Sequence, residues 1–276
     1  MGFLRVHGHI SQTMNKASYT FTHAIVREPG NSILDGLRAV DTGTPDLSIF
    51  KQHHKDYIAA LESTGATVIQ LAVNDEFPDS VFVEDSALCL PEGAISMRPG
   101  APTRFGEAAL MHIELSSFYS DIVALNGPGH VEGGDILCTE KEVLVGLSAR
   151  TDIPGVNALR TLLEQWGHTL RIVDTPKEIL HFKTDCSLLD EETILCTKRL
   201  AATGCFNDYR VIHTAEGEEA CANAIRFNEL VIMPAGFSKT QELLEASGYS
   251  VRPVGNTEAA KLDGGMSCLS LRFSPH

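Results

Sequence analysis

A recurring pair of apolar strands joined by a polar turn is the feature that most restricts how this chain folds. The pair occurs four times, in residues 84–97, 132–146, 184–196 and 223–233. Each pair begins with a polar or acidic turn, and a second short polar turn separates its two strands. Apolar runs separated by tight polar turns are typical of β-hairpins. The chain is therefore predicted to be built from equivalent modules.

A fifth pair is divided between the two ends of the chain. Residues 267–273 supply one apolar strand near the C-terminus, and residues 23–27 supply its expected partner near the N-terminus. Pairing these two strands would close the modules into a ring and remove an exposed sheet edge.

Amphipathic helices are predicted between the hairpins, because apolar residues recur there at spacings of three and four. Several of these helices are followed by glycine and a further short apolar strand, which is a usual way for a helix to end. The clearest helices are predicted over residues 48–64, 106–119, 156–167 and 239–247.

Each module is thus predicted to run strand, strand, helix, strand, and the chain contains five modules. Asp85, Asp135 and Asp185 stand 50 residues apart in equivalent turns, as expected of a true internal repeat. The predicted fold class is α/β, a closed propeller of five ββαβ modules with five-fold pseudosymmetry. The turns before the first strands would meet at one central mouth, so a site there would draw on distant parts of the sequence.

The catalytic domain is predicted to span residues 22–276 as a single unit. Residues 1–21 lack strand or helix periodicity and the apolar core of a signal peptide, so we interpret them as a disordered or non-native extension, with Met14 as an alternative start. No apolar run approaches the length of a membrane span. The seven cysteines are irregularly spaced and include no C-x-x-C, which favours a reducing cytoplasm over a disulfide framework or a zinc finger.

The charge of the chain restricts the kind of partner it binds. A formal net charge of -14 disfavours nucleic acid and anionic membranes and suits a small cationic substrate. The sequence indicates no cofactor and no resident metal. It shows no interface either, so the oligomeric state stays open, with a homodimer as one option.

Cys268 is the strongest candidate for a chemical role. It follows the acidic, glycine-rich turn Asp263–Gly265 and precedes the last apolar strand. Paired glycines allow unusual backbone angles and the close approach of a ligand. The alternative is a small core residue, which is the commonest use of a free cysteine. The predicted place of Cys268 at the central mouth favours a nucleophile.

His181 and Glu132 are the expected partners of this thiol. His181 opens the third hairpin, in a turn equivalent to the one before Cys268. A lone histidine between apolar residues is otherwise a hydrogen-bonded core residue. Glu132 stands in the matching turn of the second hairpin, where a carboxylate would orient the imidazole and support its charged form.

Further charged residues in matching positions are candidates for binding a substrate. Strand-like alternation over residues 79–85 places Asp79 and Asp85 on one face, with Glu84 beside them; turn caps are the alternative. Arg98 and Arg150 both follow second strands, where two guanidinium groups would fix one carboxylate. For either arginine alone, a surface position is the alternative.

Together these residues resemble the dimethylarginine dimethylaminohydrolase family of the guanidino-group-modifying superfamily. The matching segments run in order from about residue 22 to residue 273 and so cover nearly the whole chain. The resemblance implies the superfamily fold, the five-module α/β propeller or pentein. The segments that carry it are Leu34–Leu37, Phe77–Asp85, Arg98–Ala101, Val131–Asp135, Ser148–Thr151, Leu180–Thr184 and Asp263–Cys268.

The resemblance implies the reaction and the roles of the catalytic residues. The thiolate of Cys268 would attack the guanidinium carbon of a methylated arginine, and His181 would protonate the departing dimethylamine or methylamine. Water, activated by His181, would then hydrolyse the covalent S-alkylthiouronium to citrulline, while Glu132 positions the histidine. The activity expected is a hydrolase of C–N bonds in linear amidines.

The resemblance also implies the substrate-binding residues. Glu84 and Asp85 are expected to hold the guanidinium, and Arg98 and Arg150 the α-carboxylate. The loop of residues 30–45 is expected to act as a lid. The α-amino group is assigned to Asp79 and to the backbone oxygens of Leu37 and Leu262.

Other activities stay open at this point. Arginine deiminases, amidinotransferases and other guanidino or ureido hydrolases share the superfamily. Arginine deiminases typically carry a helical insertion for which this chain has no room, and usually have aspartate where Lys183 stands. A non-catalytic binding propeller would need no thiol, histidine and acid set. Zinc bound through Cys268 would be an inhibitory side reaction, because no further soft ligands stand at metal-site spacing.

Overall fold

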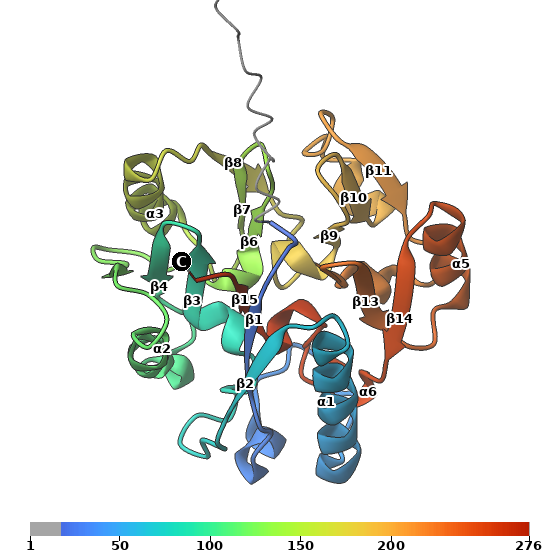
Figure 1. Ribbon diagram of the computed structural model, residues 1–276, viewed down its shortest axis with the longest axis horizontal. Helices are drawn as coiled ribbons and strands as arrows, with labels where there is room; N and C mark the ends of the chain where they lie inside the picture. Colours follow the sequence, from blue (N-terminus) through green and yellow to red (C-terminus); the bar gives the residue numbers. More distant parts are fainter. Residues whose placement is uncertain (1–17, 276) are drawn as a thin grey trace, which may run out of the picture.

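Five three-stranded sheets stand around a common centre in the structure, a computed structural model that describes residues 18–275 (Figure 1). In every sheet the middle strand pairs antiparallel with one neighbour and parallel with the other. This is the ββαβ module with its helix between the two parallel strands. The predicted fold class, a five-module α/β propeller, is confirmed.

The elements follow the same order in each module. The first contains β15 (Leu271–Phe273), β1 (His23–Arg27), α1 (Leu47–Glu62) and β2 (Thr67–Leu71). The second contains β3 (Ala87–Leu90), β4 (Gly93–Ser96), α2 (Glu107–Leu115) and β5 (Ile122–Ala124). The third contains β6 (Ile136–Cys138), β7 (Val143–Leu147), α3 (Ile153–Gln165) and β8 (Leu170–Asp174). The fourth contains β9 (Cys186–Leu188), β10 (Thr193–Cys196), α4 (Lys198–Ala201) and β11 (Arg210–His213). The fifth contains β12 (Ile225–Phe227), β13 (Leu230–Pro234), α5 (Ser238–Ala246) and β14 (Ser250–Val254), and α6 (Thr257–Ala260) follows it.

The first module joins the two ends of the chain. β15 lies antiparallel to β1, with Phe273 opposite His23 and Leu271 opposite Ile25. Figure 1 shows this C-terminal strand beside the blue N-terminal strand near the middle of the molecule. The predicted closure is confirmed, and it holds the residues just before β15 close to the centre.

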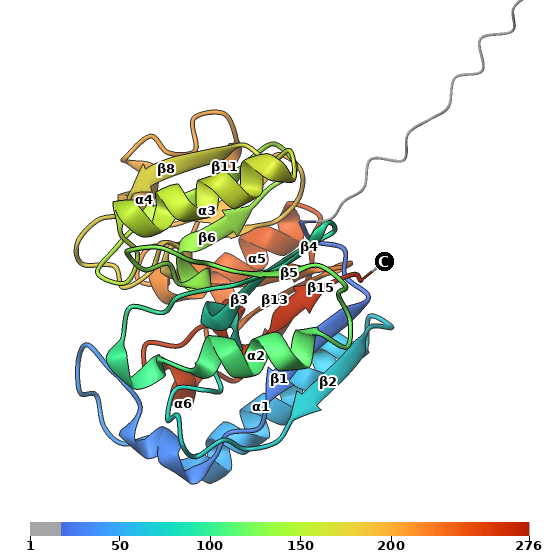
Figure 2. The same ribbon diagram turned by 90° about the vertical axis from the view of Figure 1, so that its left-hand side faces the viewer.

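The helices cover the outside of the sheets, as α2 and α3 do in Figure 2. α1 begins where Asp46 accepts hydrogen bonds from the backbone N–H groups of Ser48 and Ile49, which satisfies donors that a helix start leaves open. Its inner face buries Phe50 and Tyr57 against the sheet. The helix of the fourth module, α4, is a single turn, which is too short to show a helical spacing of apolar residues in the sequence.

The repeated acidic residues tie one module to the next. Asp85 Oδ1 accepts the backbone N–H of Gly134 at 2.8 Å, and Asp135 Oδ1 accepts that of Phe182 at 2.8 Å. Asp185 instead binds within its own module, to Thr197 and Arg199. Two of the three aspartates in the 50-residue period therefore form buried hydrogen bonds to the turn of the next module.

The first described residues pack against the fifth module. Tyr19 is buried, its carbonyl accepts the backbone N–H of Asn228 at 2.8 Å, and the ring of Phe21 packs at a tilt against that of Phe227. Most of the predicted extension, residues 1–17, lies outside the described residues. Within the described range, no helix has the length and apolar character needed to cross a membrane.

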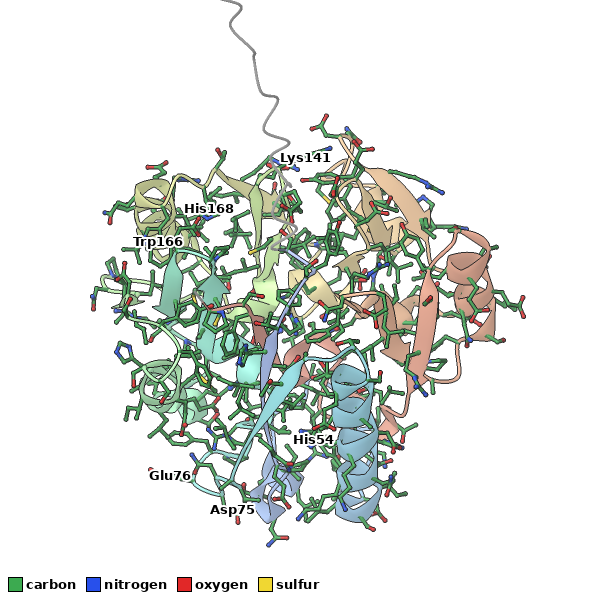
Figure 3. All side chains as sticks on the ribbon, viewed as in Figure 1. His54, Asp75, Glu76, Lys141, Trp166 and His168 are labelled. Carbon is green, nitrogen blue, oxygen red and sulfur yellow. The ribbon has the colours of Figure 1, made fainter. Side chains whose placement is uncertain are left out.

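His54 lies on α1 (Figure 3), and its side chain is buried. Its ring is 2% exposed, and in the described part of the chain its Nε2 has no hydrogen-bond partner. Burial lowers the pKa of His54 to about 4, although Glu28 opposes the shift. Because the folded pKa lies below the unfolded value, the stabilisation is complete above about pH 6.5 and is lost as the pH falls toward 4.

We therefore expect protonation of His54 to cost about 2.5 kcal/mol of unfolding free energy between pH 7.5 and pH 4.5. Urea titrations at the two pH values measure this loss in the wild type and in His54→Leu, which cannot titrate there. The variant should lose less stability than the wild type over the same interval. Equal losses in both proteins would show that His54 does not carry the acid sensitivity.

Candidate active site

Four short 3-10 helices carry the candidate residues to the centre of the propeller. Each lies just before the first strand of a module, and η2 contacts η7 and η4, while η4 contacts η5. Residues 79–85 do not form the predicted strand; turns and η2 replace it, because the chain bends sharply into β3. The four helices are η2 (Val83–Ser86), η4 (Gly133–Asp135), η5 (Phe182–Thr184) and η7 (Ser267–Leu269).

A cavity of about 130 Å³ lies among these turns. The structure brings together eight of the residues expected from the sequence, and they come from four modules. Asp79 and Asp85 reach the same cavity through a turn and a helix, although strand alternation was the wrong reason to expect it. The eight residues are Leu37, Asp79, Asp85, Glu132, Arg150, His181, Leu262 and Cys268.

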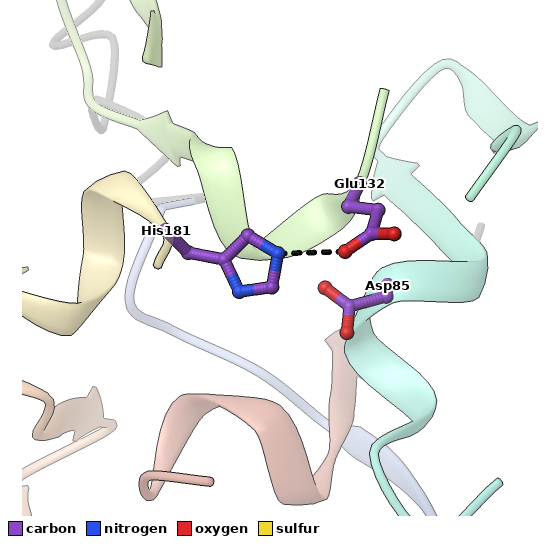
Figure 4. A group of neighbouring side chains, drawn as sticks. All are labelled: Asp85, Glu132 and His181. Carbon is purple, nitrogen blue, oxygen red and sulfur yellow. Dashed lines mark hydrogen bonds and ion pairs between the residues drawn. The ribbon is translucent and has the colours of Figure 1, made fainter. Parts of the chain in front are cut away.

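His181 and Glu132 form a buried pair at the cavity wall (Figure 4). His181 Nε2 lies 2.6 Å from Glu132 Oε2, and the imidazole edge packs so closely on Gly134 that a Cβ there would lie 2.8 Å from Nδ1. Burial disfavours the charged ring, but the carboxylates of Asp135, Asp85 and Glu132 outweigh it and raise the pKa of His181 to about 9. The histidine is therefore protonated at neutral pH and can donate a proton into the cavity.

The surroundings of Cys268 favour its neutral thiol form. Its Sγ lies 3.4 Å from the backbone nitrogen of Gly265 and 3.9 Å from Asn223 Nδ2. Burial, followed by the charges of Glu84 and Asp85, raises the pKa of the thiol to about 12. A cation bound next to the sulfur would reverse this effect, since an opposite charge favours the thiolate. Asn223, which also accepts the N–H of Ser267, was not anticipated from the sequence.

Arg104 supplies a positive charge at the cavity that the sequence analysis missed. Its buried guanidinium donates to Asp85 Oδ2 at 2.5 Å, to both oxygens of Glu107 and to the carbonyl of Phe82. The signal available in the sequence was Pro102, which starts a helical turn, with Glu107 three residues after the arginine. That turn brings the side chain back toward the centre.

Arg98 does not reach the cavity, which corrects the expectation for this residue. Its Nη1 donates to the carbonyl of Gly129 at 3.2 Å, and the side chain lines a separate groove of about 600 Å³ beside α2. The cause is the path of the chain after β4, where Arg98 pairs with Val131 and so runs along the next module. Arg150, in contrast, lines the cavity with Nη1 3.7 Å from Glu132 Oε1.

Three residues of the loop predicted to act as a lid lie at the cavity. The backbone N–H of Leu37 donates to Asp79 Oδ1 at 3.0 Å, and that of Ala39 donates to Asp263 Oδ2 at 2.6 Å. Leu37, Arg38 and Ala39 all line the cavity. The structure thus holds this loop against two carboxylates of the site.

Glu84, which is expected among the substrate-binding groups, does not line the cavity. Its Oε1 accepts Lys183 Nζ at 2.6 Å and Arg272 Nη2 at 2.5 Å. These three side chains line a second chamber of about 400 Å³ and not the cavity. Two largely shielded cations bind the carboxylate on the side of this second chamber, while its neighbour Asp85 lines the cavity.

Asp85, Glu132 and His181 offer ligand atoms that all lie within 4.8 Å of one another (Figure 4). All three side chains already make hydrogen bonds to other groups of the protein. Asp85 is bound by Gly134 and Arg104, and Glu132 by His181 and the N–H of Gly100. A metal ion here would have to displace this hydrogen-bond network.

Comparison with known proteins identifies the relatives of this chain. The family model for arginine deiminase matches residues 72–272. An N(G),N(G)-dimethylarginine dimethylaminohydrolase of Pseudomonas aeruginosa is 38% identical over 92% of this chain and 100% of its own length.

Two solved structures are similar over the same part of the chain. A cysteine-to-serine mutant of the Pseudomonas aeruginosa enzyme complexed with citrulline has a TM-score of 0.90, with 37% identity over 92% of this chain and 100% of its own. A dimethylarginine dimethylaminohydrolase with a histidine-to-glycine substitution, in an adduct with S-methyl-L-thiocitrulline, has a TM-score of 0.89 at 37% identity and the same coverage. With the cavity already described, these matches show that the chain belongs to the dimethylarginine dimethylaminohydrolase family, within the wider arginine deiminase family.

Proposed function

We propose that this protein hydrolyses Nω-methylated arginines to citrulline and dimethylamine or methylamine. The observation that carries the proposal is the convergence of Cys268, His181 and Glu132 on one small cavity that also presents carboxylates. The family membership supports the same activity. The net charge of -14 is compatible with a cationic substrate.

The cavity offers complementary groups for each end of such a substrate. Asp85 faces the cavity next to Cys268 and suits the guanidinium. Arg150 suits the α-carboxylate, and Arg104 adds positive charge at the wall in place of Arg98. Asp79, with the backbone oxygens of Leu37 and Leu262, suits the α-amino group.

The chemistry follows from the charge states of the site. A bound guanidinium lowers the pKa of the adjacent thiol, which releases its proton to solvent, and the resulting thiolate attacks the guanidinium carbon. His181 gives its proton to the amine nitrogen as the C–N bond breaks, which leaves an S-alkylthiouronium on Cys268. The neutral imidazole then takes a proton from water, the hydroxide adds to the same carbon, and the C–S bond breaks to release citrulline and the thiol. Glu132 holds the ring in place and stabilises its charged form through both steps.

The proposal also covers the cellular compartment and the domain that carries the activity. All seven cysteines are free, which supports a reducing cytoplasm as the compartment. We assign the activity to a single domain of residues 22–276 that acts on a small cationic substrate without a cofactor.

A substrate panel tests the proposed function. Purified protein should release citrulline from asymmetric dimethylarginine and from monomethylarginine, and at least about tenfold more slowly from arginine, because the cavity must distinguish the methyl groups. Citrulline is measured colorimetrically, and the released amine by chromatography. Turnover of arginine alone would indicate a deiminase. Failure with all three substrates would redirect the search to other guanidino and ureido compounds.

A further inference from the structure

One carboxylate oxygen behind the cavity connects the segments that carry the reactive groups. Glu84 Oε1 accepts hydrogen bonds from Lys183 and from Arg272, residues 99 and 188 positions away in the sequence. Glu84 is 3% exposed, and the side chains of Lys183 and Arg272 are 11% and 15% exposed. Because all three groups are largely shielded from water, their hydrogen bonds are strong and costly to break.

Arg272 fixes the turn that holds the nucleophile. Its Nη1 donates to the carbonyls of Ser267 and Ser270, both at 2.8 Å, and its Nη2 donates to Glu84. Ser267 is the first residue of the short helix that contains Cys268, and Ser270 directly follows that helix. The planar guanidinium therefore sets the distance between the Cys268 turn and the η2 helix of Glu84 and Asp85.

Lys183 makes the corresponding connection to the general acid. It lies two residues after His181 in η5, and its ammonium group binds Glu84 at 2.6 Å. Asp85, which faces the cavity, is the next residue after Glu84. The segments that bear Cys268, His181 and Asp85 are thus all tied to Glu84.

We propose that Glu84 is a positioning residue which, through Arg272 and Lys183, sets the relative places of Cys268, His181 and Asp85, and that it does not bind the substrate. The proposal rests on the proposed function, because it concerns the geometry of that same site. It assigns Arg272 a role in holding the nucleophile. A misplacement of reacting groups by about 1 Å can cost 10²-fold in rate, so such a connection affects turnover strongly.

The same three groups also act on the charge of the thiol. Glu84 and Asp85 raise the pKa of Cys268, and Lys183 lowers it. Removing the charge of Glu84 leaves two cations uncompensated near the sulfur, which favours the thiolate. The ionisable groups whose charges act on Cys268 include Glu84 and Asp85 before β3, Lys183 before β9, Arg272 on β15 and Tyr57 on α1. The charged and titratable residues that line the cavity with Cys268 are Arg38, Asp79, Asp85, Arg104, Glu132, Arg150, His181 and Asp263.

Glu84→Gln therefore gives a combination of effects that distinguishes the proposal from its alternatives. Alkylation of Cys268 by iodoacetamide at pH 7, followed by mass spectrometry without substrate, should become about tenfold faster, as expected for a thiol pKa lowered by one unit. At the same time kcat for dimethylarginine should fall about 100-fold with little change in KM. If Glu84 instead bound the substrate, its substitution would raise KM. If the variant misfolded, it would lose its circular-dichroism signature and its cooperative unfolding.

Arg272→Lys separates geometry from charge. The lysine keeps the positive charge but cannot hold Ser267, Ser270 and Glu84 together, so kcat should fall at least tenfold while the pH dependence of Cys268 alkylation stays as in the wild type. Glu142→Gln is the matched control, because Glu142 pairs with Arg171 outside the cavity; its kcat and alkylation rate should match the wild type.

The proposal is overturned if Glu84→Gln raises KM with kcat unchanged, or if Arg272→Lys turns over normally. If the wild type releases no citrulline, the proposed function fails. The alkylation rate of Cys268 still tests the effect of Glu84 on the thiol pKa: faster alkylation in Glu84→Gln supports that effect, and an unchanged rate contradicts it.

Discussion

Cys268→Ser is expected to lower citrulline release from dimethylarginine by at least about 10⁴-fold while leaving ligand binding almost intact. Serine fills the same space, so the cavity keeps its shape and its carboxylates. A hydroxyl is much harder to ionise than a thiol, and the burial and negative charges that already raise the thiol pKa to about 12 oppose a serine alkoxide still more strongly. Binding and chemistry should therefore separate cleanly in this variant.

Two measurements establish this separation. Citrulline release gives the loss in rate, and isothermal titration with citrulline gives an affinity that should stay within about threefold of the wild type. Mass spectrometry of a rapidly quenched reaction should detect an adduct on Cys268 in the wild type and none in the serine variant. Cys138→Ser, a substitution of a half-buried thiol in the other chamber, is the control and should keep its activity. Substantial turnover by Cys268→Ser would exclude covalent catalysis through this residue.

The fold was predictable from the sequence because its determinants are local. Each hairpin shows its two apolar runs and its polar turn within about 15 residues, and the longer helices show the spacing of their apolar residues within a single module. The pairing of β15 with β1 is not local, but it follows from the need to cover two otherwise open sheet edges. The one-turn helix α4 was missed because four residues carry no periodic signal.

The reactive centre was also predictable, whereas the charged groups around it were only partly so. Cys268, His181 and Glu132 stand in equivalent turns, and the propeller brings equivalent turns together. The repeat fixes where a turn lies but not where a side chain points. Arg98 and Arg150 hold matching positions in the sequence, yet only Arg150 reaches the cavity, because the chain after β4 pairs with the next module. The direction of Glu84 depends on partners 99 and 188 residues away, which no local pattern reveals.

His181→Ala is the second substitution with a large expected effect, and its size should depend on the leaving group. With dimethylarginine, kcat should fall by about 10³-fold or more, since an amine departs from carbon only after it is protonated and the variant has no acid to do this. With S-methylthiocitrulline the leaving group is a thiolate, which needs no proton. The variant should therefore still form the C–S bond to Cys268 and expel methanethiol.

The second half of the reaction should then stop, because no base remains to activate water. Mass spectrometry should find the thiouronium adduct accumulated on Cys268 of His181→Ala, whereas the wild type passes through it to citrulline. Glu132→Gln is the graded control. It keeps the imidazole and a hydrogen-bonding side chain beside it but removes the negative charge that helps the ring to hold its proton, so both steps should slow by less than in His181→Ala. Rapid hydrolysis of the adduct in His181→Ala would assign the base to another group. A variant that fails to form the adduct even with the thiolate leaving group would mean that His181 is needed to activate the thiol, because the protonated ring then does more than protonate the departing amine.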